Sequence, residues 1–147
     1  MTPSDTERGA GYLVKRVQQA LRRSCDTALR PTGLSMAQYA VLRALADHPD
    51  ASAAELARLC FVTRQSLQDV LRGLRSAGLI VSADAPARGR ARALQLSSLG
   101  KQRLKVSRAA MASVESAMVQ GISRSTREKL SQLLTACAEN LEALSDR

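Results

Sequence analysis

Residues 52–100 constrain the fold of this chain more than any other stretch. They read "SAAELARLCFVTRQSLQDVLRGLRSAGLIVSADAPARGRARALQLSSLG". The apolar spacing predicts two short helices joined by a tight turn, and then a strand, an arginine-rich loop and a second strand. That order is typical of a winged helix-turn-helix, whose second helix enters the major groove of DNA. We therefore expect a mainly α-helical chain with a small β-hairpin wing.

Capping and apolar signals set the bounds of these two helices. Ser52-Ala-Ala-Glu55 predicts a capping box that opens the first helix, and Phe61-Val62 predicts the turn. Thr63 is the predicted N-cap of the second helix, and Gly78 is the glycine that ends it. The predicted inward residues are Leu56, Leu59 and Cys60 in the first helix and Leu67, Val70, Leu71 and Leu74 in the second. The strands are expected at 79–81 and 93–96.

Positive charge is concentrated in the same region. Residues 51–108 hold 11 Lys and Arg against 3 Asp and Glu, a net of +8 within a chain of net charge +9. Such a patch is what binding to phosphates requires. With two Tyr, one Phe and no Trp, the chain lacks the aromatic platforms on which RNA and single-strand binders stack bases. Double-stranded DNA is therefore the leading hypothesis for the partner.

The outward face of the second helix supplies the predicted DNA contacts. Glutamine can pair with adenine and arginine with guanine or phosphate, whereas Ser and Thr at this end serve as caps or phosphate contacts. In the loop, arginines that alternate with small residues suit a narrow minor groove. An ordinary solvated helix face is the alternative, and Asp69 is expected to brace an arginine. The predicted DNA-binding residues are Thr63, Arg64, Gln65, Ser66, Gln68, Arg72, Arg88, Arg90 and Arg92.

Apolar helices are also predicted outside this segment. The first nine residues are expected to fray, and a long helix follows from Tyr12 until Pro31 and Gly33 close it. A capping box at 35–38 opens a helix that ends near Asp47. A helix from Ser97 to about 120 is followed by a last helix, which a capping box at 125–128 is expected to start. That last helix has an apolar stripe at Leu130, Leu134, Cys137, Leu141 and Leu144.

A single winged lobe cannot cover all the apolar faces of these flanking helices. A homodimer built from both chain ends is therefore predicted, and two-fold symmetry suits the reading of two DNA half-sites. Within one compact protomer we expect an N-terminal tail and dimerisation helix at 1–34, a winged helix-turn-helix DNA-binding region at 35–100, and C-terminal dimerisation helices at 101–147.

Three segments together resemble the MarR family of bacterial transcription regulators. They are "GLSMAQYAVLRAL", the helix-turn-helix "SAAELARLCFVTRQSLQDVLRGLRSAGLI" and the wing with its following helix, "RGRARALQLSSLGKQRL". The resemblance implies a homodimeric, ligand-responsive repressor that binds a pseudo-palindromic operator, with Arg90 in the minor groove. Arg88 stands where the family pattern has an acidic residue that braces the wing. The end of the second strand, "QLSSLG", fits the family pattern L-T-x-x-G.

The resemblance also implies an effector, commonly a small aromatic or phenolic acid, in a cleft between the dimerisation helices and the DNA-binding lobe. By position the ligand-binding residues would be Tyr12, Tyr39 and Arg43, although Tyr39 also fits plain core packing. A rival within the same class is a redox sensor that uses Cys25, since Arg22, Arg23 and Arg30 nearby would favour its thiolate. Cys60 and Cys137 are interpreted as core. The basic residues at 101–108 are interpreted mostly as a solvated face.

Other functional classes find less support. We see no glycine-rich phosphate loop, no metal-ligand spacing and no nucleophile with a base, so we expect no enzyme, cofactor or metal site. His48 is interpreted as a surface residue. Without a secretory signal or a membrane-spanning run, a cytoplasmic location is expected. The alternative from another class is a winged domain that binds small molecules or proteins without specific DNA binding.

Overall fold

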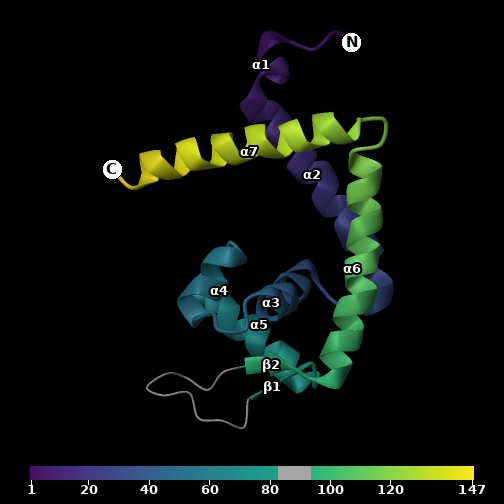
Figure 1. Ribbon diagram of the computed structural model, residues 1–147, viewed down its shortest axis with the longest axis vertical. Coiled ribbons are helices and arrows are strands. Elements are labelled where there is room, and N and C mark those ends of the chain that lie inside the picture. The colour runs from purple at the N-terminus through teal and green to yellow at the C-terminus, as the bar shows by residue number, and fades with distance from the viewer. Residues whose placement is uncertain (83–93) are drawn as a thin grey trace. The chain divides into compact units, whose positions relative to one another are not determined.

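The computed structural model describes residues 1–82 and 94–147 (Figure 1). It divides into two compact units, residues 1–114 and 115–147. The elements in chain order are α1 (Asp5–Arg8), α2 (Ala10–Leu29), the 3₁₀ turn η1 (Arg30–Thr32), α3 (Met36–Asp47), α4 (Ala53–Leu59), α5 (Arg64–Ser76), β1 (Ile80–Ser82), β2 (Leu94–Leu96), α6 (Ser98–Met118) and α7 (Arg124–Ser145). The predicted mainly helical fold with a small hairpin is confirmed.

The core of the first unit forms where α3, α4 and α5 pack together (Figure 1). Leu42, Leu67 and Leu74 are fully buried there, and Ile80 of β1 and Leu104 of α6 complete the cluster. The inward positions predicted for α5 from its helical spacing are thus the ones that pack. Leu59 and Cys60, also predicted inward, are partly buried against the same core.

The hairpin follows directly from the end of α5. Ala77 caps this helix, and Gly78 takes a left-handed conformation with φ of 73°. The Gly78 N–H donates to Arg75 O at 3.0 Å and the Leu79 N–H to Leu74 O at 2.9 Å, which is the Schellman pattern. β1 then pairs with β2 in antiparallel register, Ile80 opposite Leu96. β1 begins one residue later than predicted, and residues 94–96 of the predicted second strand are confirmed as β2.

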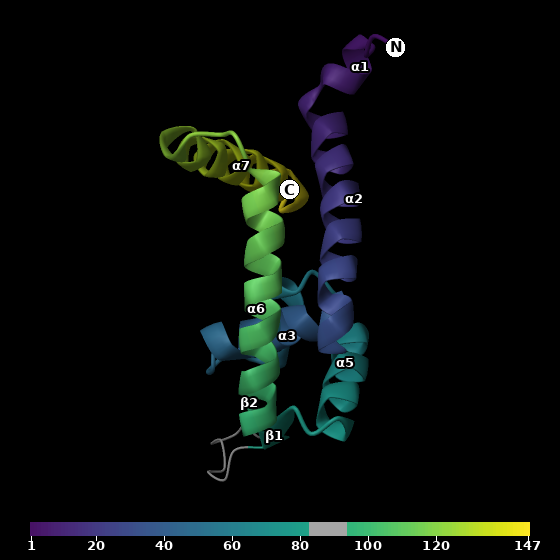
Figure 2. The ribbon, with the colours of Figure 1, turned by 90° about the vertical axis from the view of Figure 1, so that its right-hand side faces the viewer.

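The Ser97–Gly100 segment packs the start of α6 closely against the backbone that leads into β1. The Ser97 hydroxyl donates to Gly78 O at 2.6 Å and accepts from the Gly100 N–H at 3.0 Å, while the Ser97 N–H donates to Leu79 O. A Cβ at Gly100 would overlap that Leu79 carbonyl. Glycine is therefore required where the start of α6 lies on the backbone leading into β1, as Figure 2 lets the reader follow.

Two cations of α6 fasten it to the rest of the first unit. The Arg103 guanidinium donates to Thr32 O at 3.1 Å, and that of Arg108 donates to Asp47 at 2.7 Å. The interpretation of residues 101–108 as mostly a solvated face is wrong for Arg103, which is partly buried, whereas Arg108 stays exposed and still pairs with Asp47. Sequence spacing along α6 could not show it, because both acceptors lie far away in the chain.

The starts of α1 and α7 and the capping of α4 differ from the sequence predictions. Residues 5–8 form α1 rather than a frayed end, since Ser4 and Glu7 make a reciprocal capping box. Ser52 caps α4 by accepting from the Glu55 N–H, but in the described structure only this half of the predicted box forms. The N-cap of α7 lies two residues earlier than predicted, because Ser123 rather than Ser125 accepts from the Thr126 N–H. The predicted box at 35–38 is confirmed.

The terminal helices leave apolar side chains exposed. α7 buries no residue, and Cys137 is exposed rather than part of a core as predicted. Exposed apolar residues on α2 are Tyr12, Leu13, Val14 and Val17, and those on α7 are Leu133, Leu134, Leu141 and Leu144. Within residues 1–82 and 94–147, no helix combines the length and the hydropathy that crossing a membrane requires.

Candidate nucleic-acid interface

The exposed side of α5 is the candidate interface. One side of α5 is buried through Leu67, Leu71 and Leu74, so the opposite side of the helix faces outward. Every residue predicted for DNA contact on this helix is exposed: Thr63, Arg64, Gln65, Ser66, Gln68 and Arg72. Arginine and glutamine thus share one accessible helical surface, which suits hydrogen bonding to base edges and phosphates.

The N-terminus of α5 is ordered by its own side chains. Thr63 Oγ1 accepts from the Ser66 N–H and donates to Ser66 Oγ, both at 3.0 Å. These two residues therefore act as a cap, one of the two roles predicted for them. The first turn of α5 carries unpaired backbone N–H groups and Arg64, so positive potential gathers at this end of the helix.

Arg72 is paired within its own helix. Its guanidinium lies 3.1 Å from the Asp69 carboxylate, which confirms the prediction that Asp69 braces an arginine. Both side chains are mostly exposed, at 71% and 57%, so the pair contributes at most about 1 kcal/mol. Because the pair is weak, an Arg72 N–H group can donate to a phosphate oxygen in place of the Asp69 carboxylate.

The turn between α4 and α5 contains an unusual aromatic residue. Phe61 has φ of 56°, the left-handed region, and its side chain is 93% exposed. The Phe61 N–H donates to Arg58 O at 3.2 Å and the Val62 N–H to Ala57 O at 3.0 Å. This is the same Schellman pattern as at the end of α5, with Phe61 in the place of Gly78. The sequence predicts a turn at Phe61 but not its left-handed conformation.

Of the predicted effector residues, the structure brings Tyr39 and Arg43 together. They lie one turn apart on α3, and Tyr39 is half-buried, so burial raises the pKa of its phenol. Tyr12 stands apart. Cys25 of α2 is close enough to Tyr39 to affect its pKa, and Tyr12 precedes Cys25 by more than three turns of that helix, about 20 Å along the axis. Within one protomer Tyr12 therefore does not join the other two.

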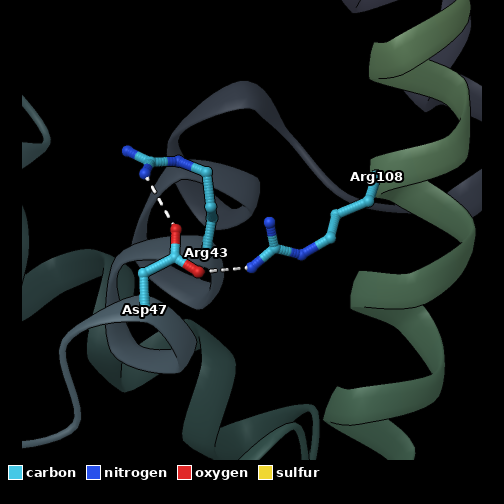
Figure 3. Close-up of polar contacts among 3 residues, drawn as sticks. All are labelled: Arg43, Asp47 and Arg108. Atoms are coloured by element: carbon cyan, nitrogen blue, oxygen red, sulfur yellow. Dashed lines mark hydrogen bonds and ion pairs between the residues drawn. The ribbon is translucent and has the colours of Figure 1, made fainter.

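Figure 3 shows Asp47 between two arginines. Arg43 of the same helix approaches it at 3.3 Å, and Arg108 reaches it from α6 at 2.7 Å. The hydrogen bond from Arg108 lowers the pKa of Asp47, and the charges of both arginines add to the effect. Two cations facing one carboxylate leave a net positive charge beside Tyr39, which an organic anion can use.

Ser107 adds a polar group next to Arg108 in the chain. Its hydroxyl is fully buried and finds no hydrogen-bond partner in the described part of the chain. Buried groups of this kind are ordinarily satisfied, often by water or a ligand.

Cys25 is buried, whereas the arginines near it in the sequence are exposed. The Cys25 side chain is only 6% exposed, whereas Arg22, Arg23 and Arg30 are exposed. The thiol therefore faces the interior, away from an aqueous oxidant. Cys60 lies against the core, and burial raises the pKa of its thiol.

A surface hollow of about 450 Å³ lies beside the loop between α3 and α4. Three carboxylates line it, Asp47, Asp50 and Glu55, together with His48 and Arg58. That charge disfavours phosphates and acidic ligands. The predicted wing contacts Arg88, Arg90 and Arg92 lie outside the described residues.

A helix-turn-helix followed by a two-stranded hairpin, with arginine and glutamine exposed on its second helix, defines a winged helix-turn-helix protein. A model of the MarR family matches residues 32–91. The chain is 31% identical over 124 residues to the HTH-type transcriptional repressor Rv2887 of Mycobacterium tuberculosis, covering 84% of this chain and 89% of that one. The chain belongs to the MarR family of winged-helix transcription regulators.

Solved structures of Rv2887 superpose on this chain. The complex of that protein with salicylic acid has a TM-score of 0.72 and 29% identity, covering 88% of this chain and 96% of the other. The complex of Rv2887 with DNA has a TM-score of 0.70 and 29% identity, covering 88% and 97%. These likenesses confirm the winged-helix fold predicted from the sequence.

Proposed function

We propose that this chain is a ligand-responsive repressor that binds a pseudo-palindromic operator in double-stranded DNA as a homodimer. The observation that carries the proposal is the exposed arginine and glutamine face of α5 on a packed winged-helix lobe. The net charge of +8 over residues 51–108 supports it. The family relative Rv2887 has been crystallised with DNA.

Each predicted DNA-binding residue has a role in this proposal. Gln65 and Gln68 read adenine, Arg64 binds guanine or phosphate, and Arg72 binds phosphate. Thr63 and Ser66 fix the start of the helix. On sequence grounds alone, Arg88, Arg90 and Arg92 contact the minor groove.

The dimer rests on the exposed apolar faces of α2 and α7. Exposed apolar residues gathered on one helix in this way are typical of a protein–protein interface. We accordingly assign dimerisation to residues 1–34 and 101–147 and DNA binding to residues 35–100. Two recognition helices related by a two-fold axis then read two half-sites.

The effector we propose is a small aromatic acid. Its carboxylate would bind the cationic group of Arg43 and Arg108, with its ring against Tyr39. Rv2887 was crystallised with salicylic acid. Because Arg108 joins α6 to the end of α3, a ligand that prefers the opened ion pair would favour a lobe position unsuited to DNA.

We also propose that the protein acts in the cytoplasm, with the chromosome, and that it has no enzymatic activity. The support for both statements is family membership. The alternative of a redox sensor at Cys25 is not favoured, since the thiol is buried.

The test is duplex selection followed by salt titration. Random duplexes are enriched on the purified protein, and fluorescence anisotropy gives Kd for a recovered sequence and its scrambled form as salt rises. We expect the recovered duplex to bind at least ~10³-fold more tightly than the scrambled one. Arg64→Ala should lower the salt slope by about one, whereas Gln65→Ala should mainly relax base preference.

Arg124→Ala is the matched control, because it removes another exposed arginine, from α7. It should leave Kd for the recovered duplex near the parent value. Equal binding of recovered and scrambled duplexes would contradict the proposal.

A further inference from the structure

Phe61 is the most exposed of the three aromatic residues in this chain. Its side chain is 93% exposed, against 43% for Tyr12, while Tyr39 is half-buried. An aromatic ring is the side chain that gains most from burial. In the described structure of one protomer, however, the Phe61 ring is almost fully exposed.

The backbone at Phe61 is costly as well. Phe61 and Gly78 occupy equivalent positions after α4 and α5, and both have positive φ, 56° and 73°. Glycine adopts this conformation without a steric penalty, whereas phenylalanine places its Cβ against the backbone. Glycine at position 61 would form the same helix end with less strain, so packing within the lobe does not explain the ring.

The position of Phe61 indicates what the ring can reach. It lies two residues before Thr63, the N-cap of α5, so their Cα atoms are at most about 7 Å apart. Exposed Arg64 and Gln65 follow on the first turn of the same helix. The ring therefore lies at the end of α5 that is proposed to enter the major groove.

We propose that Phe61 contacts the C5-methyl group of a thymine in each operator half-site. This inference rests on the proposed DNA binding and adds a specificity-determining residue to it. The thymine methyl is the apolar group that bases present in the major groove, and phenylalanine is a side chain suited to contact it. The strained, exposed ring thus acts in recognition rather than in folding.

The experiment combines a protein variant with a base analogue. Phe61→Gly removes the ring and relieves the backbone, and deoxyuridine in place of thymidine removes only the methyl group. The probes are a duplex recovered by selection on the parent protein and versions of it with each thymidine replaced in turn. Anisotropy gives Kd for every pair of protein and duplex.

For the parent, we expect replacement of one particular thymidine to weaken binding about fourfold per half-site, the equivalent of one buried methyl group. Phe61→Gly should bind the unmodified duplex more weakly by at least this factor and should show no further loss on that replacement. Its melting temperature should equal or exceed that of the parent, which separates the effect from misfolding. His48→Ala removes another exposed ring, at the end of α3 and outside the residues assigned to DNA contact or dimerisation, and should bind like the parent.

Several results would overturn the inference. Phe61→Gly could bind every duplex as the parent does, or the parent could be indifferent to all replacements. If Phe61→Gly instead changes the sedimentation of the protein without DNA, the ring is a protein contact. If the parent itself recovers no duplex, the proposed DNA binding fails and the inference with it. Parental binding without an effect at Phe61 overturns the inference alone.

Discussion

The winged lobe buries the leucines of its helices, whereas the terminal helices leave apolar residues at similar spacing exposed. In the lobe, leucines at helical spacing such as Leu42, Leu67 and Leu74 are fully buried. In α7, leucines at equally regular spacing, Leu134 and Leu141 among them, remain 48% and 65% exposed. A helical apolar stripe thus predicts a helix with a face to bury and does not say which surface covers it. The lobe completes its core within one chain, and α7 does not.

Polar contacts sharpen the contrast. In the first unit they join distant segments, as from Ser97 to Gly78 and from Arg103 to Thr32. In the second unit they are local, since Arg127 donates to Ile122 O and Val119 O just before α7. Local bonds stabilise a helix and its turn, but they supply no tertiary surface for its apolar side.

The largest effect on stability should follow from adding a side chain at Gly100. Gly100→Ala places a Cβ on the Leu79 carbonyl, so α6 must move away from the start of β1. We expect a loss of about 3 kcal/mol in the free energy of unfolding. Urea denaturation followed by circular dichroism measures it.

Gly73→Ala is the matched control, because Gly73 lies within α5 and its nearest neighbour is the end of the Gln38 side chain at 3.8 Å. Alanine is the better helix former, so this variant should gain up to about 1 kcal/mol. Equal stability of the two variants would show that the lobe is not tightly packed at the junction of β1 and α6.

A smaller effect should follow from neutralising Asp47. Asp47→Asn removes the charge that holds Arg43 and Arg108, and we expect a loss of about 0.5 kcal/mol near pH 7 because the pairs are partly exposed. The pKa of Asp47 is lowered from its ordinary value of 3.8. Its contribution is therefore complete above that value and is lost as the pH falls through the lower folded pKa.

Unfolding free energies of the parent and Asp47→Asn should therefore differ at pH 7 and converge in acid. Asp50→Asn removes an exposed carboxylate from the adjacent loop and should show a smaller difference. A gap for Asp47→Asn that persists unchanged well below pH 3 would mean that Asp47 acts through something other than its charge.

Much of the lobe was predictable because its signals are local. Thr63 as N-cap and Gly78 as the end of α5 follow from side-chain chemistry at a helix end. The contacts of Arg103 and Arg108 were not predicted, because their partners lie far away in the sequence. Phe61 shows a further limit, since a left-handed position is visible from sequence only when glycine or asparagine occupies it.

The candidate site was predictable in part for the same reason. Helical periodicity identifies the outward face of α5, and i to i+4 spacing brings Tyr39 and Arg43 together on α3. Helical periodicity could not place Tyr12, because its distance from Tyr39 and Arg43 depends on the length and course of α2. The burial of Cys25 likewise depends on packing that neighbouring charges in the sequence do not indicate.

The central claim is that the terminal helices are completed by a second copy of the chain and that this dimer binds DNA. The most direct test is sedimentation equilibrium of the parent and of Leu141→Asp, with Asn140→Asp as a control on an adjacent exposed position. We predict that the parent and control have twice the 15.8 kDa mass of one chain. Leu141→Asp should sediment at the single-chain mass with unchanged helical content, and it should lose affinity for the selected duplex. A parent of single-chain mass, or a Leu141→Asp protein that remains dimeric and binds DNA like the parent, would contradict the account.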